Sequence, residues 1–478
     1  MKELRWPLVV FLFCLPIAVV VLGWRLPWMG EAKPLATPLA VAANEMEFAW
    51  IHTTTNATTW ERFIYGLMRL RRTMPGLQID DSRAFLDSTT AIPELRITRD
   101  GHPTTVCIRW YKLQNAVTTQ DWIAALAQRT PAPVAIIGGG STDRAIDLAQ
   151  AMAKTTSWNG SAPALLLTTA TADDDGSIGL TELYKNRTFR FCFSNSRMAE
   201  AVLDFLKNQP NRNSTKQPIS FFSVYWQDDR YSYDLCDRFR DAVLKCWPNE
   251  SERKFEGLWT VPFSVGGFES PNDFERKTAA DIARQMMALP ADRPIVLILP
   301  AVVLPAKRLL QSIHDAEPTL SERFVVVTGD GIPVNALLRD GEFAWPVHTM
   351  PVPLLLFTHE NPFAWDDGTS QPLGYELKKP NTTEEQMHFS EMGRRLFSIV
   401  LNPERTSVLQ ADALIGELRN QKGFFQANGE REPGTGEHVV MLGQPRKDTM
   451  LTVYRRAQGR PWTKVDQVVL HPATAGTP

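Results

Sequence analysis

The sequence lacks any surplus of basic residues, and this absence bears on its partners. Of its 478 residues, 51 are Lys or Arg and 53 are Asp or Glu, so the formal net charge is −2. A protein that binds nucleic acid needs clustered positive charge to neutralise phosphates. We therefore expect no nucleic-acid partner.

Cysteine is scarce, and no metal-ligand spacing is present. The five cysteines form no Cys-x-x-Cys pair and stand at positions 14, 107, 192, 236 and 246. Cys236 and Cys246 lie ten residues apart on one predicted helix, about 15 Å from each other, so we expect no disulfide between them. The acidic run Asp173–Asp175 could hold a metal, but a solvated turn is the favoured interpretation. We expect neither a metal nor a cofactor.

Three catalytic loop signatures fail in the stretch PVAIIGGGSTDRAIDLAQAM, residues 133–152. A short apolar run typical of a buried strand is followed by three glycines and then by Ser141 and Thr142, where a helix begins. Asp143 stands where a dinucleotide loop or a nucleophile elbow needs glycine, and the loop has no lysine for a Walker site. A helix N-terminus that can accept a carboxylate or phosphate remains. An ordinary strand-to-helix turn that binds nothing is the alternative.

The N-terminus carries one long uncharged run. Residues Trp6–Trp24 contain no charge and follow Lys2 and Arg5, and 19 residues suffice to cross a bilayer. The Ala-x-Ala site at Ala40–Ala42 lies far beyond this run. We predict an uncleaved anchor at 1–25, with cleavage as the alternative, then a proline-containing linker at 26–45. The rest of the chain would lie outside the cytoplasmic membrane, in the periplasm or outside the cell.

After the linker, predicted strands alternate with amphipathic helices, which indicates parallel sheets with helices on both faces. The first helix has an apolar stripe of Trp60, Phe63, Ile64, Leu67 and Met68. There are too many strands for one compact sheet, so two α/β lobes are expected. The strands are predicted at 47–51, 105–110, 134–137, 164–167, 219–225, 258–261, 294–299 and 323–327, and short tail strands at 424–426, 439–442 and 451–454. The further helices are predicted at 119–128, 198–207, 233–246, 273–288, 305–315 and 385–401.

The sequence motifs at the element junctions resemble those of the type I periplasmic binding proteins, specifically the branched-chain amino-acid (Leu/Ile/Val) receptor family of ABC transporter substrate-binding proteins. The resemblance covers roughly residues 46–470. It rests on motifs in the family's order: GGGST at 138–142, Thr169-Ala170-Thr171, Phe189-Arg190-Phe191, the acidic loop and tyrosine of 224–231, and the C-terminal segments Phe424–Gly429 and Val453–Trp462.

The resemblance implies a clamshell of two Rossmann-like lobes behind the N-terminal transmembrane helix. Lobe 1 would comprise 46–190, completed by 345–402, and lobe 2 would comprise 191–344, completed by 403–470. A small ligand would be held in the cleft by residues of both lobes. By position these are Ser141, Thr142, Thr169 and Thr171 from the first lobe and Tyr231 and Asp330 from the second, with Trp60 as a candidate for the apolar side.

Each assignment has a plainer alternative. Asp330 could be a turn residue between Gly329 and Gly331, and Trp60 lies on the stripe expected in the core. His52 and His348 lie near strand ends without an identifiable partner. The glycine loop lacks the proline often found at its start in the family, and Trp226 and Arg230 make the second-lobe loop bulkier.

The sequence thus predicts a membrane-anchored solute-binding protein that binds a small ligand, most simply an amino acid, without covalent chemistry. It would serve an ABC permease or act as a sensor. A degenerate cleft used as a protein-interaction domain is the alternative. An extracytoplasmic α/β hydrolase is disfavoured because no ordered nucleophile, base and acid are visible. Six Asn-x-Ser/Thr sequons leave a eukaryotic luminal receptor domain open.

Overall fold

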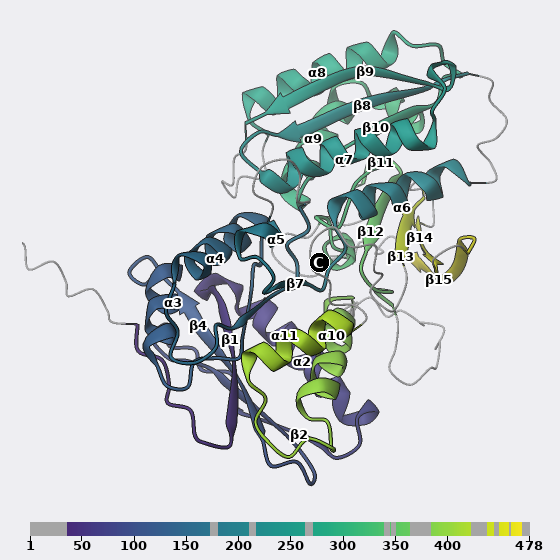
Figure 1. Cartoon of the computed structure of the whole chain (residues 1–478). Helices are drawn as coiled ribbons and strands as arrows, with labels where there is room; N and C mark the ends of the chain where they lie inside the picture. Colours follow the sequence, from purple (N-terminus) through teal and green to yellow (C-terminus); the bar gives the residue numbers. More distant parts are fainter. Residues whose placement is uncertain are drawn as a thin grey trace, which may run out of the picture.

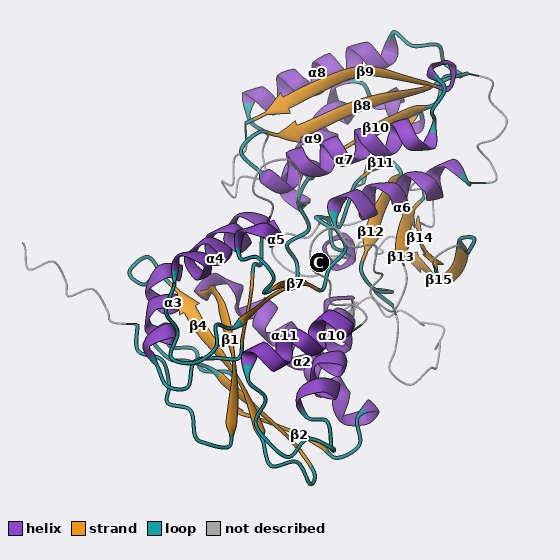
Figure 2. Ribbon diagram, in the orientation of Figure 1, coloured by secondary structure: helices purple, strands orange, loops and turns teal. Residues whose placement is uncertain are grey.

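The computed structural model describes residues 36–172, 180–209, 217–262, 271–338, 345, 350–363, 384–421, 437–443, 449–457 and 460–470. These residues form two α/β lobes, one above the other in Figures 1 and 2, each built around one mixed sheet. Among the described residues, no helix combines the length and apolarity that crossing a bilayer requires. The anchor expected at 1–25 lies outside the described residues.

The first lobe contains a seven-stranded sheet in the order β2-β3-β4-β1-β5-β6-β7. β1 pairs in parallel with β4 and β5, and β2, β3 and β4 form an antiparallel extension. The strands are β1 (Glu45–Thr53), β2 (Leu77–Arg83), β3 (Glu94–Arg99), β4 (Thr105–Leu113), β5 (Ala135–Gly138), β6 (Ala164–Leu167) and β7 (Thr188–Arg190). The parallel part brings the carboxyl ends of β1, β5 and β6 to one edge.

Helices cover both faces of this sheet because each strand alternates its side chains between two apolar cores. One core contains residues of α2 (Ala57–Thr73), α10 (Glu384–Val400) and α11 (Ala411–Asn420). The other contains residues of α3 (Thr119–Gln128), α4 (Thr142–Lys154) and α5 (Leu180–Leu183).

The second lobe contains an eight-stranded sheet in the order β15-β14-β13-β12-β11-β10-β8-β9. Strands β8 to β12 run parallel, whereas β12 to β15 pair antiparallel. They are β8 (Ile219–Trp226), β9 (Arg253–Val261), β10 (Ile295–Ile298), β11 (Phe324–Val327), β12 (Leu354–Thr358), β13 (Glu437–Leu442), β14 (Thr449–Arg456) and β15 (Thr463–Leu470). Here α6 (Asn195–Lys207) and α7 (Arg230–Cys246) pack on one face, and α8 (Asp273–Met287) and α9 (Val303–Ala316) on the other.

The chain passes between the lobes more than once. It leaves the first lobe after β7 and enters the second at α6, then returns from β12 to α10. The expected division differs from this arrangement at two places. β12 lies in the second lobe's sheet although 345–402 was assigned to the first lobe, and α11 packs in the first lobe's core although 403–470 was assigned to the second.

The α/β class and most expected elements are confirmed. Helix α3 and strand β6 have the predicted bounds, and α2 buries four of the five predicted stripe residues, with Met68 partly buried. The sheets are mixed rather than wholly parallel, because β2 and β3 in one lobe and β13 to β15 in the other run antiparallel. The tail strand expected at 424–426 lies outside the described residues.

Candidate functional site

The glycine loop between β5 and α4 forms a tight turn that only glycine permits. Gly139 has φ +77°, and a β-carbon there would lie 2.7 Å from Cβ of Ala145. A β-carbon at Gly138 would lie 2.4 Å from Leu148. Ser141 caps α4: its Oγ accepts from the Arg144 amide at 3.4 Å. The first turn of α4 is thereby fixed at the carboxyl edge of the sheet.

The loop after β6 lies beside the glycine loop. Thr169 Oγ1 donates to the Gly139 carbonyl at 3.0 Å. The Thr171 carbonyl accepts from the Asn195 amide at 2.7 Å and from Arg190 Nη1 at 3.2 Å. Neighbouring parallel strands end at the same edge, so the four hydroxyl residues predicted for the first lobe come to one side of its sheet. Thr142 and Thr171 are buried there, whereas Ser141 is exposed.

His52, at the end of β1, is a neighbour of this loop for which no role was predicted. Its ring covers Gly140, where a β-carbon would lie 2.1 Å from Nε2. The Thr53 amide donates to its Nδ1 at 3.0 Å, so the neutral ring carries its proton on Nε2. Burial, together with the charge of Arg144, lowers the pKa of His52 to about 4. His52 is therefore a neutral ring at pH 7, against the backbone of the glycine loop.

In the second lobe, Tyr231 and Asp330 lie next to each other. Asp229 caps α7 by accepting from the Tyr231 amide at 3.2 Å, which sets the first turn of that helix. The Tyr231 hydroxyl accepts from the Gly331 amide at 2.8 Å. Burial first, and the nearby carboxylate of Asp330 next, raise the pKa of Tyr231 well above its usual value. Tyr231 is therefore a neutral side chain beside the carboxyl group of Asp330.

Asp330 is held by a histidine that the sequence analysis did not single out. Its Oδ2 lies 2.8 Å from Nε2 of His359, which follows β12. The ring of His388, on α10, lies 5.2 Å from the His359 ring between centroids, and its Nε2 donates to the Thr168 carbonyl at 3.0 Å. A continuous path of contacts thus runs from the loop after β6 in one lobe to Asp330 in the other.

Buried acid and base groups surround this path. Burial, then the neighbouring His359, lower the pKa of His388 to about 3, so its ring is neutral at pH 7. Burial and the charge of Glu385 raise the pKa of Glu384 well above its usual value, although the Val334 and His359 backbones hydrogen-bond its carboxyl. Nothing local in the sequence signals these groups, because they come together from three separate segments.

The N-termini of α4 and α7 meet where the lobes face each other. Burial raises the pKa of the Asp143 carboxyl on α4, and the positive charge of Arg230 on α7 opposes this effect. Burial and the charge of Asp143 raise the pKa of Asp229 to about 6. Acidic groups of both lobes therefore line the junction beside the hydroxyl residues.

Trp60 lies in the first lobe's core rather than beside the other predicted site residues. Its side chain is 2 % exposed, and its Nε1 donates to the Ala84 carbonyl at 2.7 Å. Its ring packs edge-on to Trp50, which in turn stacks on His52. Contact of Trp60 with a ligand stays a prediction. The connection of Trp60 to the glycine loop runs through the rings of Trp50 and His52.

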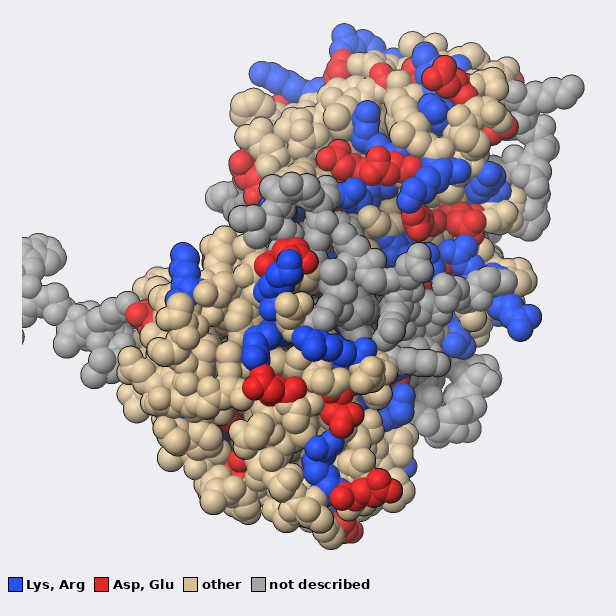
Figure 3. Space-filling view, viewed as in Figure 1, with Lys and Arg blue, Asp and Glu red and all other residues tan. Residues whose placement is uncertain are grey.

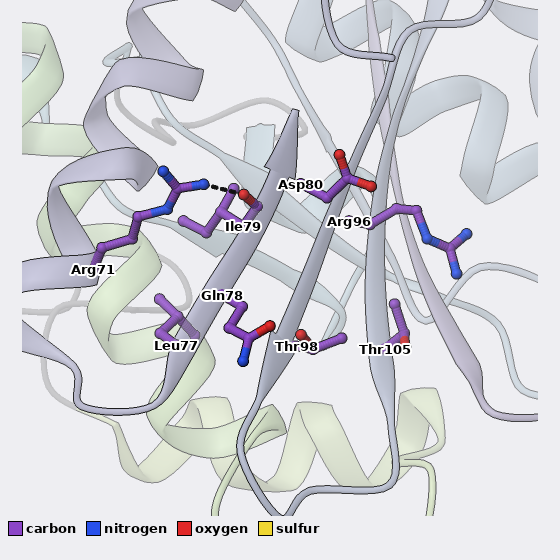
Figure 4. A pocket seen from close by; sticks show the side chains of 8 residues that line it. All are labelled: Arg71, Leu77, Gln78, Ile79, Asp80, Arg96, Thr98 and Thr105. Atoms are coloured by element: carbon purple, nitrogen blue, oxygen red, sulfur yellow. Dashed lines mark hydrogen bonds between the residues drawn. The ribbon is translucent and has the colours of Figure 1, made fainter. Parts of the chain in front are cut away.

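One cavity of about 560 Å³ lies elsewhere, on the face of the antiparallel extension β2-β3-β4 (Figure 4). Its polar side chains bond within the chain: Gln78 Nε2 donates to Asp100 at 2.8 Å, and Arg96 pairs with Glu45 at 2.6 Å. In Figure 4, Arg71 reaches from α2 to the Ile79 carbonyl on β2. None of its lining residues belongs to the loops described above.

The distribution of charged side chains and the grouping of possible metal ligands are two further features of the described residues. Figure 3 shows basic and acidic side chains interspersed over both lobes on the face in view. Within the described ranges, no group of three or more His, Cys, Asp or Glu side chains could hold a metal ion. The acidic run Asp173–Asp175, His348 and the motif Phe424–Gly429 lie outside those ranges.

The comparisons with known proteins concern the fold. A scan against protein-family models found no match, and a search of curated protein sequences found none. An ABC transporter substrate-binding protein from Desulfitobacterium hafniense, in complex with Leu, is 13% identical, covers 88% of this chain and 100% of its own, and gives a TM-score of 0.51. A protein assigned to a branched-chain amino acid ABC transporter from Silicibacter pomeroyi is 12% identical, covers 85% of this chain and 96% of its own, and gives 0.54. The chain therefore has the fold of ABC transporter substrate-binding proteins, among them leucine-binding and branched-chain amino-acid types.

Proposed function

We propose that this chain is an extracytoplasmic solute-binding protein that captures a small zwitterionic or anionic ligand, most simply an amino acid, between its lobes. It binds without covalent chemistry, delivers the ligand to an ABC-type permease or acts as a sensor, and is anchored to the cytoplasmic membrane through residues 6–24. The site comprises Ser141, Thr142, Thr169, Thr171, Tyr231 and Asp330, with Trp60 behind its apolar side.

The observation that carries this proposal is the complementary chemistry of the two facing edges. The first lobe offers hydroxyls and the N-terminus of α4, which favour a carboxylate. The second offers the carboxylate of Asp330 beside the neutral phenol of Tyr231. A zwitterion has one charged group for each edge. The fold shared with substrate-binding proteins, one of them in complex with Leu, supports the same function.

The position of His52 favours a second candidate function. Its ring lies against Gly140, and Asp143 adds negative charge in the first turn of α4, where a ligand carboxylate would bind. The side chains of the first lobe thus occupy the edge where a ligand carboxylate would bind. Such an occupied edge favours a protein that no longer binds an amino acid between its lobes and binds a protein partner instead.

A thermal-shift screen of the full-length chain in detergent separates the two functions. The probes are amino acids, small peptides, amides, carboxylates and sugars. A ligand at 100 times its dissociation constant stabilises the folded state by about 2.7 kcal/mol, which raises the melting midpoint by several degrees. We expect a shift with an aliphatic amino acid that Ser141→Ala and Asp330→Asn abolish. A cooperatively folded sample that responds to none of the probes would support the interaction-domain function instead.

A further inference from the structure

His359 occupies the place where two passages of the chain between the lobes meet. It follows β12 directly, on the way back to the first lobe, and its ring stacks on Phe193, with centroids 5.7 Å apart and planes 18° apart. Phe193 belongs to the first passage, between β7 and α6. The His359 side chain is only 10 % exposed, so its contacts with the protein decide its orientation.

Both ring nitrogens of His359 have defined partners, and together they fix its tautomer. The Phe193 amide donates to Nδ1 at 3.4 Å, so Nδ1 must be an acceptor without a proton. Nε2 then carries the hydrogen and donates it to Asp330 Oδ2 at 2.8 Å. A neutral ring in this tautomer leaves the carboxylate of Asp330 with its full negative charge.

The remaining contacts of Asp330 restrict the same carboxylate. Tyr231 lies against the backbone of Gly329 and Gly331 on either side of it, and its hydroxyl interacts with Asp330. The Asp330 side chain is 16 % exposed. One oxygen is therefore held by His359, while the carboxylate as a whole keeps access to solvent at the junction.

We propose that His359 is a positioning residue that orients the carboxylate of Asp330 toward a cationic group of the ligand. The proposal rests on the proposed function and narrows it to ligands that carry an ammonium or similar cation. The neutral imidazole supplies orientation without cancelling the acid's charge, which a lysine or arginine in its place would do. Through Phe193 and His388, the same ring ties that orientation to the segments that join the lobes.

Two substitutions separate the roles of the two ring nitrogens. In His359→Gln the amide nitrogen can replace Nε2 as the donor to Asp330, whereas the Nδ1 acceptor is lost. In His359→Asn the shorter amide can accept from Phe193, whereas Asp330 is out of reach. Both are neutral and polar, and they differ in which of the two ring-nitrogen hydrogen bonds they keep. Asp330→Asn removes the charge itself.

The probes are leucine and 4-methylpentanoate, which has the same carbon skeleton and carboxylate but no ammonium. A hydrogen bond to a charged group changes affinity about tenfold to a hundredfold. We expect His359→Asn to weaken leucine binding about tenfold or more. His359→Gln should bind leucine within about threefold of wild type, and Asp330→Asn should weaken leucine binding most of the three. Binding of 4-methylpentanoate should change little in any of them. Calorimetry on the full-length chain measures all eight affinities.

A readout without ligand checks the tautomer itself. In the chain labelled with ¹⁵N-histidine, long-range proton–nitrogen spectra should show His359 as neutral with the proton on Nε2, the signal being assigned by its loss in His359→Gln. Equal losses in the Gln and Asn variants, equal effects on the two probes, or a proton on Nδ1 would overturn the role of His359 alone. A wild type that binds neither probe would overturn the proposed amino-acid function together with this proposal.

Discussion

The imidazole of His52 lies so close to Gly140 that a β-carbon at residue 140 would be 2.1 Å from its Nε2. The ring cannot move away freely, since it is 3 % exposed and stacks on Trp50. We expect Gly140→Ala to lower the free energy of unfolding by about 1–3 kcal/mol, as overpacking does. Ligand binding should weaken too, because the glycine loop must shift.

A matched control is Gly416→Ala on α11, where an added β-carbon meets nothing within 4 Å. Alanine is the better helix former there, so this variant should gain about 0.5–1 kcal/mol. Urea unfolding of both variants measures the difference. If Gly140→Ala is as stable as wild type, the ring position described for His52 is wrong.

Glu275 and Arg308 form a buried ion pair that joins α8 to α9. Arg308 Nε lies 3.0 and 2.9 Å from the two carboxylate oxygens, and Nη2 lies 2.8 Å from Oε1. Both residues are 3 % exposed or less. Arg308→Met strands a buried carboxylate and should cost about 3–5 kcal/mol.

Replacing both partners in Glu275→Leu/Arg308→Met removes the stranded charge. The double variant should therefore recover much of the stability that Arg308→Met loses, although Glu275 also accepts from the Asn272 amide in the capping box of α8. Chemical denaturation of Arg308→Met, Glu275→Leu and the double variant measures this. Additive losses would show that the two side chains do not interact.

The periodic parts of the fold were predictable because burial imposes a local pattern. Continuous apolar runs such as 164–167 and helical stripes such as that of α2 follow from which faces the core contacts. Strand β2 escaped detection because only Leu77 and Ile79 of its seven residues are buried, so its sequence is polar enough for a loop. Its strand state depends on pairing with β3, which no local pattern encodes.

The same distinction applies to the candidate site. Ser141 could be predicted as a cap because the strand, glycines and helix are contiguous, and the structure makes it one. The group around Asp330 could not, because His359 and His388 come from distant positions and only the tertiary fold brings them together. Isolated histidines carry no sequence pattern that marks such a group.

The buried His388 predicts a dependence of stability on pH. Its folded pKa of about 3 lies below the usual 6.5, so the unfolded chain takes up the proton first as the pH falls. Stability should be unaffected above about pH 6.5 and decline below it. At pH 5 the single histidine costs about 2 kcal/mol relative to pH 7.

His388→Gln tests this, because glutamine can still donate to the Thr168 carbonyl but does not titrate. The loss of unfolding free energy between pH 7 and pH 5 should be about 2 kcal/mol smaller than in wild type. His314→Gln, on α9 away from the junction, controls for the loss of a histidine. His359 and Asp330 face the ring, so their variants should be measured alongside. An unchanged pH dependence would contradict the neutral buried state of His388.

Asp229 should respond to pH in the opposite sense. Burial, and the charge of Asp143 across the junction, raise its folded pKa from 3.8 to about 6. The folded state therefore holds the proton more tightly than the unfolded chain, so ionisation costs stability as the pH rises through 6 and costs nothing below about pH 3.8.

Asp229→Asn removes the charge and keeps a good helix cap for α7. We expect this variant to be about 1 kcal/mol more stable than wild type at pH 7.5, allowing for partial exposure of the group, and equal to it at pH 4. Asp228→Asn, at the exposed neighbouring position, should show no such difference. Because the charge it removes faces Asp143 in the other lobe, Asp229→Asn should also favour the approach of the two lobes, which small-angle X-ray scattering would record as a smaller radius of gyration at pH 7.5. A gain in stability that persists at pH 4 would show that it does not arise from the carboxylate's charge.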